Sequence, residues 1–584
     1  MALGDEFKLR DWRVVPERNV LSGKNGEIHV RRQAMRVLVL LAERAGEVVS
    51  RDDFSDAIWA PAVVSENSLN RCVSELRRAL GEKPSTPDFI ETVPKQGYRL
   101  AANPEPLHPA SEIRTPAGSA APGQKSIAVL PLDRIGAGGD ESLTEGLHNE
   151  LLTSLSLLGE LQVISATSVR RYSSTTLAIG EIAAELGVAW ILEGSVQQAA
   201  GRVRVNVQLV HAATDHHHWA RTYEQPFSTK RLFAIQSEIA QDVARSLRAR
   251  ISPSEQRGID QVPTRDIEAY TRFVEARTRF NSRTESAMRR AVELFRLARD
   301  TDPEFAQAWS GLADALTLLH DYGYATGNAV LTEAREAIDQ ALELNPELAE
   351  PHASLGAWLG AVRDFQPAIR ALKRAIELRP GYAQAHNWLS WVSALSGDAE
   401  QALDSGLEAT GLDPYSVEAL SNLALGHLCR QQFEPALDAA DRVAELQPDF
   451  TTATLYSAIA AWHLGQFESV REQLHGMHVH WAGSGAQCAL ALAEVRLGNR
   501  AAAKALLERM DQSGDPFEAG LTALALGDTD AATARWHRLQ TLDYFALMVL
   551  QHDWFPDLLT AGAATESAAA LRELAASQVR RKPD

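Results

Sequence analysis

Four prolines in the second half of the chain, Pro346, Pro380, Pro414 and Pro448, lie 34 residues apart, and Pro303 precedes them. Proline lacks the backbone N–H that a helix interior needs, so it marks the end of a helix. A period of 34 residues is the length of a helix–turn–helix repeat, and such a repeat buries its apolar face only against its neighbours. The spacing therefore predicts a stacked helical array over much of the chain. A more specific functional signal must be sought outside it.

The size and composition of the chain predict a multidomain protein of the cytoplasm. At 584 residues it is too long for one hydrophobic core, which stops growing at about 250–300 residues. Cys72, Cys429 and Cys488 are far apart in sequence, which argues against a disulfide framework or a thiolate zinc site. We find no apolar stretch of membrane-spanning length and no signal-peptide core. We therefore expect no membrane segment, no bound metal and no cofactor.

Charge is distributed unevenly along the chain. Residues 1–103 contain 16 Lys and Arg against 15 Asp and Glu, whereas the whole chain has 58 basic and 76 acidic residues and a net charge of −18. An acidic surface repels phosphate backbones. Any contact with nucleic acid is therefore expected in the near-neutral N-terminal segment.

Composition also marks the boundaries between segments. Residues 104–125 are rich in Pro, Ala, Gly and Ser and lack hydrophobic periodicity, which is typical of a flexible linker. We expect an N-terminal domain over residues 1–103 before this linker. After it, the apolar run Ser126–Leu132 reads as a buried strand that opens an α/β domain over residues 126–260. The helical array then occupies residues 266–580.

One predicted helix of the N-terminal domain has two distinct faces. Ser65 can cap its start and Gly81 ends it. At about 100° per residue, one face collects Leu69, Cys72, Val73, Leu76, Ala79 and Leu80. The opposite face collects Asn67, Asn70, Arg71, Ser74 and Arg78, with Arg77 at its edge. Arg and Asn pair with guanine and adenine in the major groove, although a merely solvated helix face would have the same composition.

The flanking segments favour the DNA-binding interpretation. Residues 89–100 read as a β-hairpin with a tight turn at Lys95-Gln96-Gly97. Upstream, Val48-Val49-Ser50-Arg51 leads into a short helix with a Ser-x-x-Asp capping box, and this helix ends near Trp59. With the run Asn70–Gly81, these features form a pattern over Phe7–Leu100. The pattern resembles the OmpR/PhoB-type winged helix-turn-helix, particularly its ToxR-like branch.

The resemblance implies that the N-terminal domain binds double-stranded DNA. In this family the third helix enters the major groove and the wing tip reaches the minor groove. The residues so implicated are Asn67, Asn70, Arg71, Ser74, Arg77 and Arg78 in the helix, Lys95 and Gln96 in the wing, and Trp59, which is either a phosphate contact or a core residue. Many relatives have Arg where Pro94 stands, so minor-groove contact is expected to rest on Lys95. Cys72 is interpreted as a small core residue.

The central segment resembles a second domain type. Strand-like runs and helices alternate over residues 126–252, which is an α/β pattern with mixed strands. The sequences at 127–132, 145–147 and 192–196 make it similar to the TolB-amino-terminal-like module. We interpret His216–His218 as a solvent-facing turn and not a metal site, because neighbouring residues of a strand point to opposite sides.

The helical array resembles tetratricopeptide repeats, in which small residues let two helices approach and proline ends the second. We expect about seven repeats, one of them lengthened around Asp321–Asn328. Such arrays usually present a concave groove to a protein or peptide partner, although self-association is an alternative. Trp358, Trp388, Trp391 and His386 either line that groove or fill the space between repeats.

Together these features predict a one-component transcription regulator. The winged helix would bind promoter DNA, with two copies on tandem half-sites, as is common in the family. The α/β module and the repeats would sense or bind a protein or small-molecule signal. The alternative is an interaction scaffold that does not bind DNA and docks RNA polymerase or another protein. We find no nucleophile elbow, metalloprotease motif or Walker loop and expect no enzyme.

Overall fold

The computed structural model divides into two compact units, Met1–Arg114 and Thr115–Asp584. It describes residues 7–580 except 11, 17–19, 24–25, 31, 47, 55–68, 70–71, 74–75, 78–79, 81–88, 94–96, 102–103, 107–124, 136–140, 174, 176, 200, 213–215, 227, 326, 449, 476, 478–483 and 560–563. Among the described residues, none of the helices combines the length and apolar character that a bilayer crossing requires.

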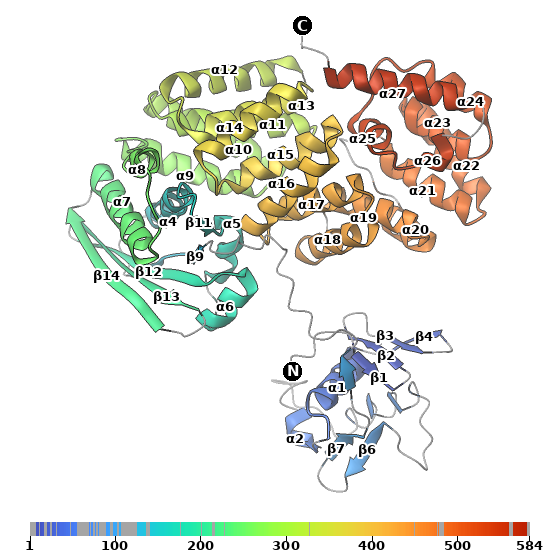
Figure 1. The fold of residues 1–584 in the computed structure, drawn as a ribbon, viewed down its shortest axis with the longest axis horizontal. Helices are drawn as coiled ribbons and strands as arrows, with labels where there is room; N and C mark the ends of the chain where they lie inside the picture. Colours follow the sequence, from blue (N-terminus) through green and yellow to red (C-terminus); the bar gives the residue numbers. More distant parts are fainter. Residues whose placement is uncertain are drawn as a thin grey trace. The chain divides into compact units, whose positions relative to one another are not determined.

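The N-terminal unit contains two antiparallel sheets (Figure 1). The first has the order β4-β3-β2-β1-β8 and consists of β1 (Phe7–Leu9), β2 (Trp12–Val15), β3 (Val20–Gly23), β4 (Gly26–His29) and β8 (Pro104–Pro106). The second has the order β5-β7-β6 and consists of β5 (Val49–Ser50), β6 (Ile90–Val93) and β7 (Gly97–Leu100). Strand β8 occupies the start of the predicted linker, and residues 107–124 of that linker lie outside the described residues.

Three helical segments complete this unit: α1 (Arg32–Glu43), α2 (Arg51–Phe54) and a third helix to which residues 69, 72, 73, 76 and 77 belong. The predicted capping box at the start of α2 is confirmed. The Asp53 N–H donates to Ser50 Oγ at 3.1 Å, and the Ser50 N–H donates to Asp53 Oδ2 at 3.0 Å. These bonds, helped by the nearby Arg44 guanidinium, lower the pKa of Asp53.

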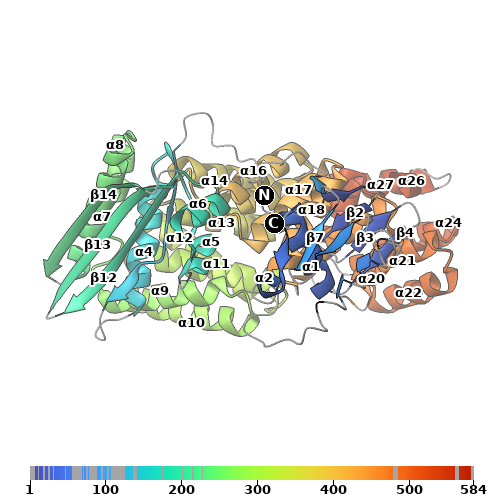
Figure 2. The same ribbon diagram turned by 90° about the horizontal axis from the view of Figure 1, so that it is seen from below.

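The large unit begins with a mixed sheet (Figure 2). Its strands are β9 (Lys125–Val129), β10 (Asp133–Ile135), β11 (Leu161–Val163), β12 (Trp190–Ala199), β13 (Arg202–His211) and β14 (His216–Pro226). The order is β11-β9-β12-β13-β14, and β10 also pairs with β12. The pairs formed by β9, β10 and β11 are parallel, whereas the β12–β13–β14 meander is antiparallel.

Strand β14 corrects one prediction. The solvent-facing turn expected at His216–His218 is wrong, because these residues continue the ladder that β14 makes with β13. The exposed His218 ring lies 5.2 Å from the ring of Trp190 on β12. The ladder with β13 holds the segment in the sheet, and the Trp190 ring also lies 4.6 Å from the ring of His211 on β13.

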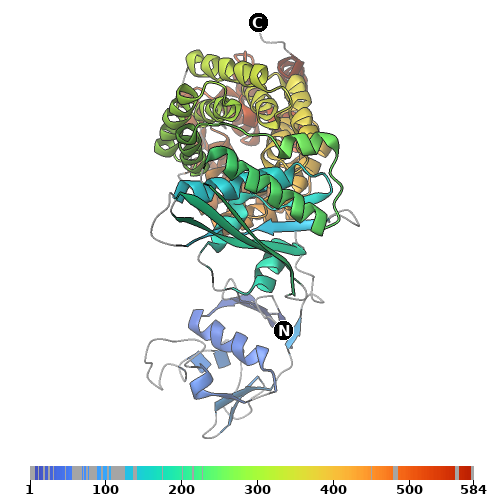
Figure 3. The ribbon, with the colours of Figure 1, turned by 90° about the vertical axis from the view of Figure 1, so that its left-hand side faces the viewer.

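Helices cover both faces of the mixed sheet (Figure 3). They are α4 (Glu141–Ser156), α5 (Ala166–Val169), α6 (Ile179–Leu186) and α7 (Thr229–Ser246), with a short 3₁₀ turn at Arg170–Tyr172 and α8 (Pro253–Ile259) after them. Along β9, Ile127 and Val129 join the core formed with α4 and α7, whereas Ala128 joins the core formed with α6. This alternation follows from the period of two in a strand.

Eight successive helix pairs follow in the described part of the chain. They are α9 (Ile267–Asn281) with α10 (Glu285–Thr301), α11 (Ala306–Asp321) with α12 (Asn328–Leu344), α13 (Ala349–Ala361) with α14 (Phe365–Leu378), α15 (Ala383–Ser396) with α16 (Ala399–Leu412), α17 (Val417–Cys429) with α18 (Phe433–Leu446), α19 (Thr451–His463) with α20 (Phe467–Leu474), α21 (Gly485–Arg496) with α22 (Arg500–Ser513), and α23 (Pro516–Ala525) with α24 (Thr529–Trp536). The chain continues with α25 (Tyr544–His552), α26 (Pro556–Leu559) and α27 (Ala564–Arg580).

The 34-residue period marks both turns of each central repeat. The prolines directly follow the residues that end the second helices: Asn345, Arg379, Asp413 and Gln447. Between the two helices of a pair stands a residue with left-handed backbone: Arg363 (φ 63°), Gly397 (87°), Gln431 (56°) and Gly465 (75°). The predicted lengthened repeat is confirmed, because residues 322–327 separate α11 from α12.

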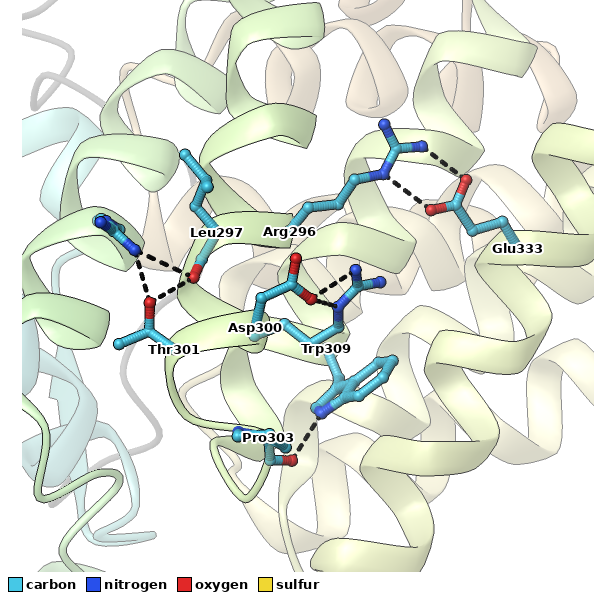
Figure 4. Close-up of polar contacts among 9 residues, drawn as sticks. Arg296, Leu297, Asp300, Thr301, Pro303, Trp309 and Glu333 are labelled. Carbon is cyan, nitrogen blue, oxygen red and sulfur yellow. Dashed lines mark hydrogen bonds and ion pairs between the residues drawn. The ribbon is translucent and has the colours of Figure 1, made fainter.

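Polar contacts connect neighbouring repeats (Figure 4). Arg296 on α10 donates from Nε and Nη2 to the two carboxylate oxygens of Glu333 on α12, at 2.9 and 2.6 Å. Trp309 Nε1 on α11 donates to the Pro303 carbonyl at 2.9 Å. Bidentate Arg–carboxylate pairs of this kind fix orientation as well as adding energy.

The mixed sheet module and the first repeats share one hydrophobic core. Its buried side chains belong to both parts, the first of them being Ile127 on β9 and the last Ile338 on α12. Ser168 Oγ donates to Asp413 Oδ1 at 2.5 Å and accepts from the Tyr415 N–H at 2.9 Å. The Ser165 N–H donates to the Leu412 carbonyl at 2.8 Å. The module is therefore docked on the turn between α16 and α17.

Helix α25 lies along three successive turns inside the helix pairs. The Arg363 guanidinium donates to the Leu542 carbonyl just before α25. Gln431 Nε2 donates to the His552 carbonyl at 3.4 Å, and His552 Nε2 contacts the Ala394 carbonyl at 2.7 Å. At Gly397, a Cβ atom would lie 2.6 Å from Gln551 Oε1. The C-terminal helices thus fold back onto α13, α15 and α17.

Replacing Gly97 with Ala should open the β5–β7 pairing. Gly97 has φ +154°, and a Cβ there would lie 2.0 Å from the Val49 carbonyl oxygen. The cost should be about 2–4 kcal/mol from strain and overpacking. Hydrogen exchange of the amides of residues 90–100 in the full-length protein should accelerate. The matched variant Gly46→Ala has φ +83° and no neighbour within 4 Å, so equal exchange in both variants would contradict this assignment.

Replacing Glu518 with Gln should make thermal stability less dependent on pH. Glu518 on α23 is 2 % exposed and lies beside Asp543, the N-cap of α25. Burial, and then repulsion from Asp543, raise the pKa of Glu518 well above its usual value. The protonated carboxyl therefore stabilises the fold at low pH, and this contribution is lost as pH rises through the folded-state pKa. The Tm of Glu518→Gln should fall less at alkaline pH than that of the wild type and of the exposed control Glu508→Gln; identical slopes would refute this.

Candidate nucleic-acid interface

The third helix of the N-terminal unit buries the face that its periodicity predicts. Its apolar residues are 0–7 % exposed: Leu69, Cys72, Val73, Leu76 and Leu80. They join one core with α1, α2, β5 and the β6–β7 hairpin. The interpretation of Cys72 as a core residue is confirmed, and Ala79 lies outside the described residues.

Arg77 connects this helix to the hairpin. Its Nη2 donates to the Ile90 carbonyl at 2.7 Å and to Thr92 Oγ1 at 2.9 Å, and its Nε donates to the same carbonyl at 3.3 Å. Three hydrogen bonds from two guanidinium nitrogens therefore join the third helix to strand β6. A rigid planar group used in this way fixes the angle between helix and wing.

Cross-strand contacts hold the wing in register. Glu91 on β6 lies opposite Arg99 on β7, and their side chains pair at 2.6 Å. Both side chains are 40 % exposed, so this pair adds alignment more than stability. At the base of the wing, the Phe54 and Tyr98 rings meet edge to face with centroids 6.3 Å apart. The hairpin is thereby fixed to α2 as well as to the third helix.

Most of the predicted DNA-binding residues lie outside the described part of the chain. They are Asn67, Asn70, Arg71, Ser74, Arg78, Lys95, Gln96 and Trp59. Arg77 is the one candidate whose contacts are described, and these contacts are with the wing. The sequence did not predict them, because a helix-face projection contains no information on a strand 13 residues away.

The Glu91–Arg99 pair could have been found from the sequence. A tight turn predicted at Lys95-Gln96-Gly97 implies a hairpin register, and the observed β6–β7 register places residues 91 and 99 directly opposite each other. Thr92 had no such signal, because a single hydroxyl on a strand does not indicate its partner. In the described part of the chain, no group of three or more His, Cys, Asp or Glu side chains is placed to hold a metal ion.

Residues 25–100 match the family described as "Transcriptional regulatory protein, C terminal". A putative adenylate cyclase 3 of Rhizobium meliloti is 30 % identical over 302 residues, which cover 49 % of this chain and 50 % of that protein. The transcriptional regulator HilA of Salmonella typhimurium is 24 % identical over 386 residues, which cover 66 % of each chain. The chain thus spans between half and two thirds of the length of these relatives.

A third relative matches a shorter stretch of the chain. The transcriptional activator CadC of Escherichia coli is 33 % identical over 94 residues, which cover 16 % of this chain and 18 % of that protein. Residues 25–100 therefore form an OmpR/PhoB-type winged helix-turn-helix domain, and the chain is similar to the transcriptional regulators HilA and CadC.

Proposed function

We propose that this protein is a one-component transcription regulator that binds promoter DNA in the cytoplasm through its winged helix. The observation that carries the proposal is the third helix, whose apolar face is buried while Arg77 fixes it to the wing. Helical periodicity predicts that residues 67, 70, 71, 74 and 78, which lie outside the described residues, face away from the core. A rigidly held helix with a polar outer face suits insertion into the major groove.

The proposal gives the basic and amide side chains separate roles. Arg71 and Arg78 donate to guanine O6 and N7, and Asn67 and Asn70 pair with adenine. Ser74 and Trp59 donate to phosphates, and Lys95 and Gln96 at the wing tip contact the minor groove. Arg77 acts as a positioning residue, since its guanidinium is engaged by Ile90 and Thr92.

In this proposal, residues 115–584 receive a protein or small-molecule signal. An apolar cavity of about 120 Å³ between successive repeats is lined by Trp388 and Trp391, together with Tyr456 and Tyr544. Two of the four residues predicted for the groove, Trp388 and Trp391, therefore line this cavity.

The other two contact the backbone of the repeats. Trp358 donates to the Leu331 carbonyl at 2.8 Å, and His386 contacts the Pro380 carbonyl at 3.0 Å. These two residues support the spacing between helices. No catalytic step is assigned to the chain.

Changing Arg71 and Arg78 together to Ala should abolish specific promoter binding. Each bidentate contact contributes about 1–3 kcal/mol of discrimination, so the double variant should bind its site roughly 30-fold or more weakly. The measurement is fluorescence anisotropy on promoter fragments recovered by genome-wide mapping of bound DNA. Lys8→Ala removes an exposed cation from β1 and is the control. Undiminished retention by the double variant, or wild-type binding that does not weaken with salt, would favour a scaffold that docks RNA polymerase or another protein.

Two copies should occupy each operator. We expect a footprint covering two tandem half-sites whose centres are about one helical turn of DNA apart, 10–10.5 base pairs. Nuclease protection at saturating protein measures the length directly, and inserting half a turn between the half-sites should weaken binding. Protection of a single half-site at saturation would show that one copy is sufficient.

A further inference from the structure

A polar cavity of about 180 Å³ lies where the mixed sheet module meets the repeats. Its walls come from α4, the loop between β11 and α5, α9, and the turn between α14 and α15. The module and the repeats are joined here by the bond from the Gly381 N–H to the Ser156 carbonyl, 3.2 Å long. Whatever occupies this cavity therefore contacts both parts of the large unit.

Two opposite charges line the cavity without using their hydrogen-bonding capacity on the protein. Glu150 on α4 and Arg277 on α9 are both partly buried. Within the described residues, neither the Glu150 carboxylate nor the Arg277 guanidinium makes a hydrogen bond or an ion pair with another side chain or with the backbone. Partly buried charges usually recover their lost hydration through such partners.

The wall behind these two residues is also incompletely satisfied. Arg379, 6 % exposed, donates from Nη1 to Glu350 Oε1 at 2.7 Å and lies 3.6 Å above the Tyr382 ring. Its Nε has no hydrogen-bond partner among the described residues, and the same is true of the buried hydroxyl of Tyr270. The cavity wall thus contains two donors without acceptors, Arg379 Nε and the Tyr270 hydroxyl, in addition to the unpaired Glu150 carboxylate.

The electrostatics of the cavity favour a cation near Glu150. Burial, and then repulsion from Glu350, raise the pKa of Glu150 to about 7, although Arg277 and Arg379 act in the opposite direction. Burial thus disfavours the ionised form of this carboxyl more than Arg277 and Arg379 favour it. An ammonium group placed against it would restore the balance, whereas a second anion would not.

Size limits the occupant further. A protein cavity of about 150 Å³ can hold benzene, so one of about 180 Å³ accommodates a compact metabolite. The lining supplies one unpaired anion, one unpaired cation and amide groups from Asn149 and Gln307. This combination complements a small molecule that has both charges.

We propose that the cavity binds a free α-amino acid, with its ammonium group on Glu150 and its carboxylate on Arg277. The proposal rests on the signal-receiving role suggested above for residues 115–584 and gives that role a site and a ligand class. Because the ligand touches α4 on one side and α9 and α15 on the other, binding stabilises the docked arrangement of module and repeats.

The test is direct binding to the full-length protein in the absence of DNA. Each proteinogenic L-amino acid is titrated by calorimetry at millimolar concentration, with acetate and n-propylamine as single-charge probes. At least one amino acid should give saturable heat and raise the Tm, and neither single-charge probe should. No saturable heat from any amino acid, or equally tight binding of acetate or n-propylamine, would overturn the proposal.

Substitutions then locate the site. Glu150→Gln and Arg277→Gln should each weaken the bound amino acid about tenfold or more, since each removes a charge-assisted hydrogen bond. Arg279→Gln alters an exposed cation on the same helix and should bind as the wild type does. Arg277→Lys keeps the charge and should bind more tightly than Arg277→Gln. Undiminished binding by both Gln variants would overturn the assignment. Since no DNA is present, failure here leaves the DNA-binding proposal intact, and failure of DNA binding leaves this one intact.

Discussion

The large unit depends on one constraint: a helix pair with a single apolar face is stable only when the next pair covers that face. Within the stack, each of the eight pairs covers the apolar face of its neighbour. At the two ends of the stack, other elements cover the apolar face. At the first end, the mixed sheet module contributes α4 and α7 to the same core as α9 to α12. At the other end, α25 and α27 pack on earlier helices of the array. The module and the C-terminal helices thus cover apolar surface that an isolated array would expose.

The winged helix meets a related requirement on a smaller scale. Its third helix contributes five apolar side chains to the core, and the hairpin is joined to it through the Arg77 contacts with Ile90 and Thr92. Gly97 permits the close approach of β7 to β5 that this arrangement needs. Helix and wing are therefore held as one rigid body, which is the condition for presenting several contacts to DNA at once.

Much of the fold follows from local signals in the sequence. The prolines and the residues before them locate the helix ends, because proline cannot continue a helix, and the Ser50–Asp53 pattern locates the start of α2. The sequence predicts about seven repeats and the described residues form eight pairs, because the 34-residue proline spacing ends at Pro448 and only the Leu-Gly turns continue the pattern after it. The His216–His218 strand was missed because its pairing with β13 is a long-range contact that composition does not encode. For the same reason, neither the contacts of Arg77 nor the cavity between Glu150 and Arg277 could be predicted: each joins elements far apart in the chain.

The position of α25 has a consequence for any partner of the repeats. Arg363, Gly397 and Gln431 form a row at the 34-residue period, and the chain's own α25 lies against all three. A covalently attached segment meets its docking surface at an effective concentration of the order of millimolar. An external polypeptide that binds to this row must therefore compete with α25, which cannot diffuse away because it belongs to the same chain. A weakly binding polypeptide will not displace α25, and only a partner with a substantially higher affinity for the row can do so.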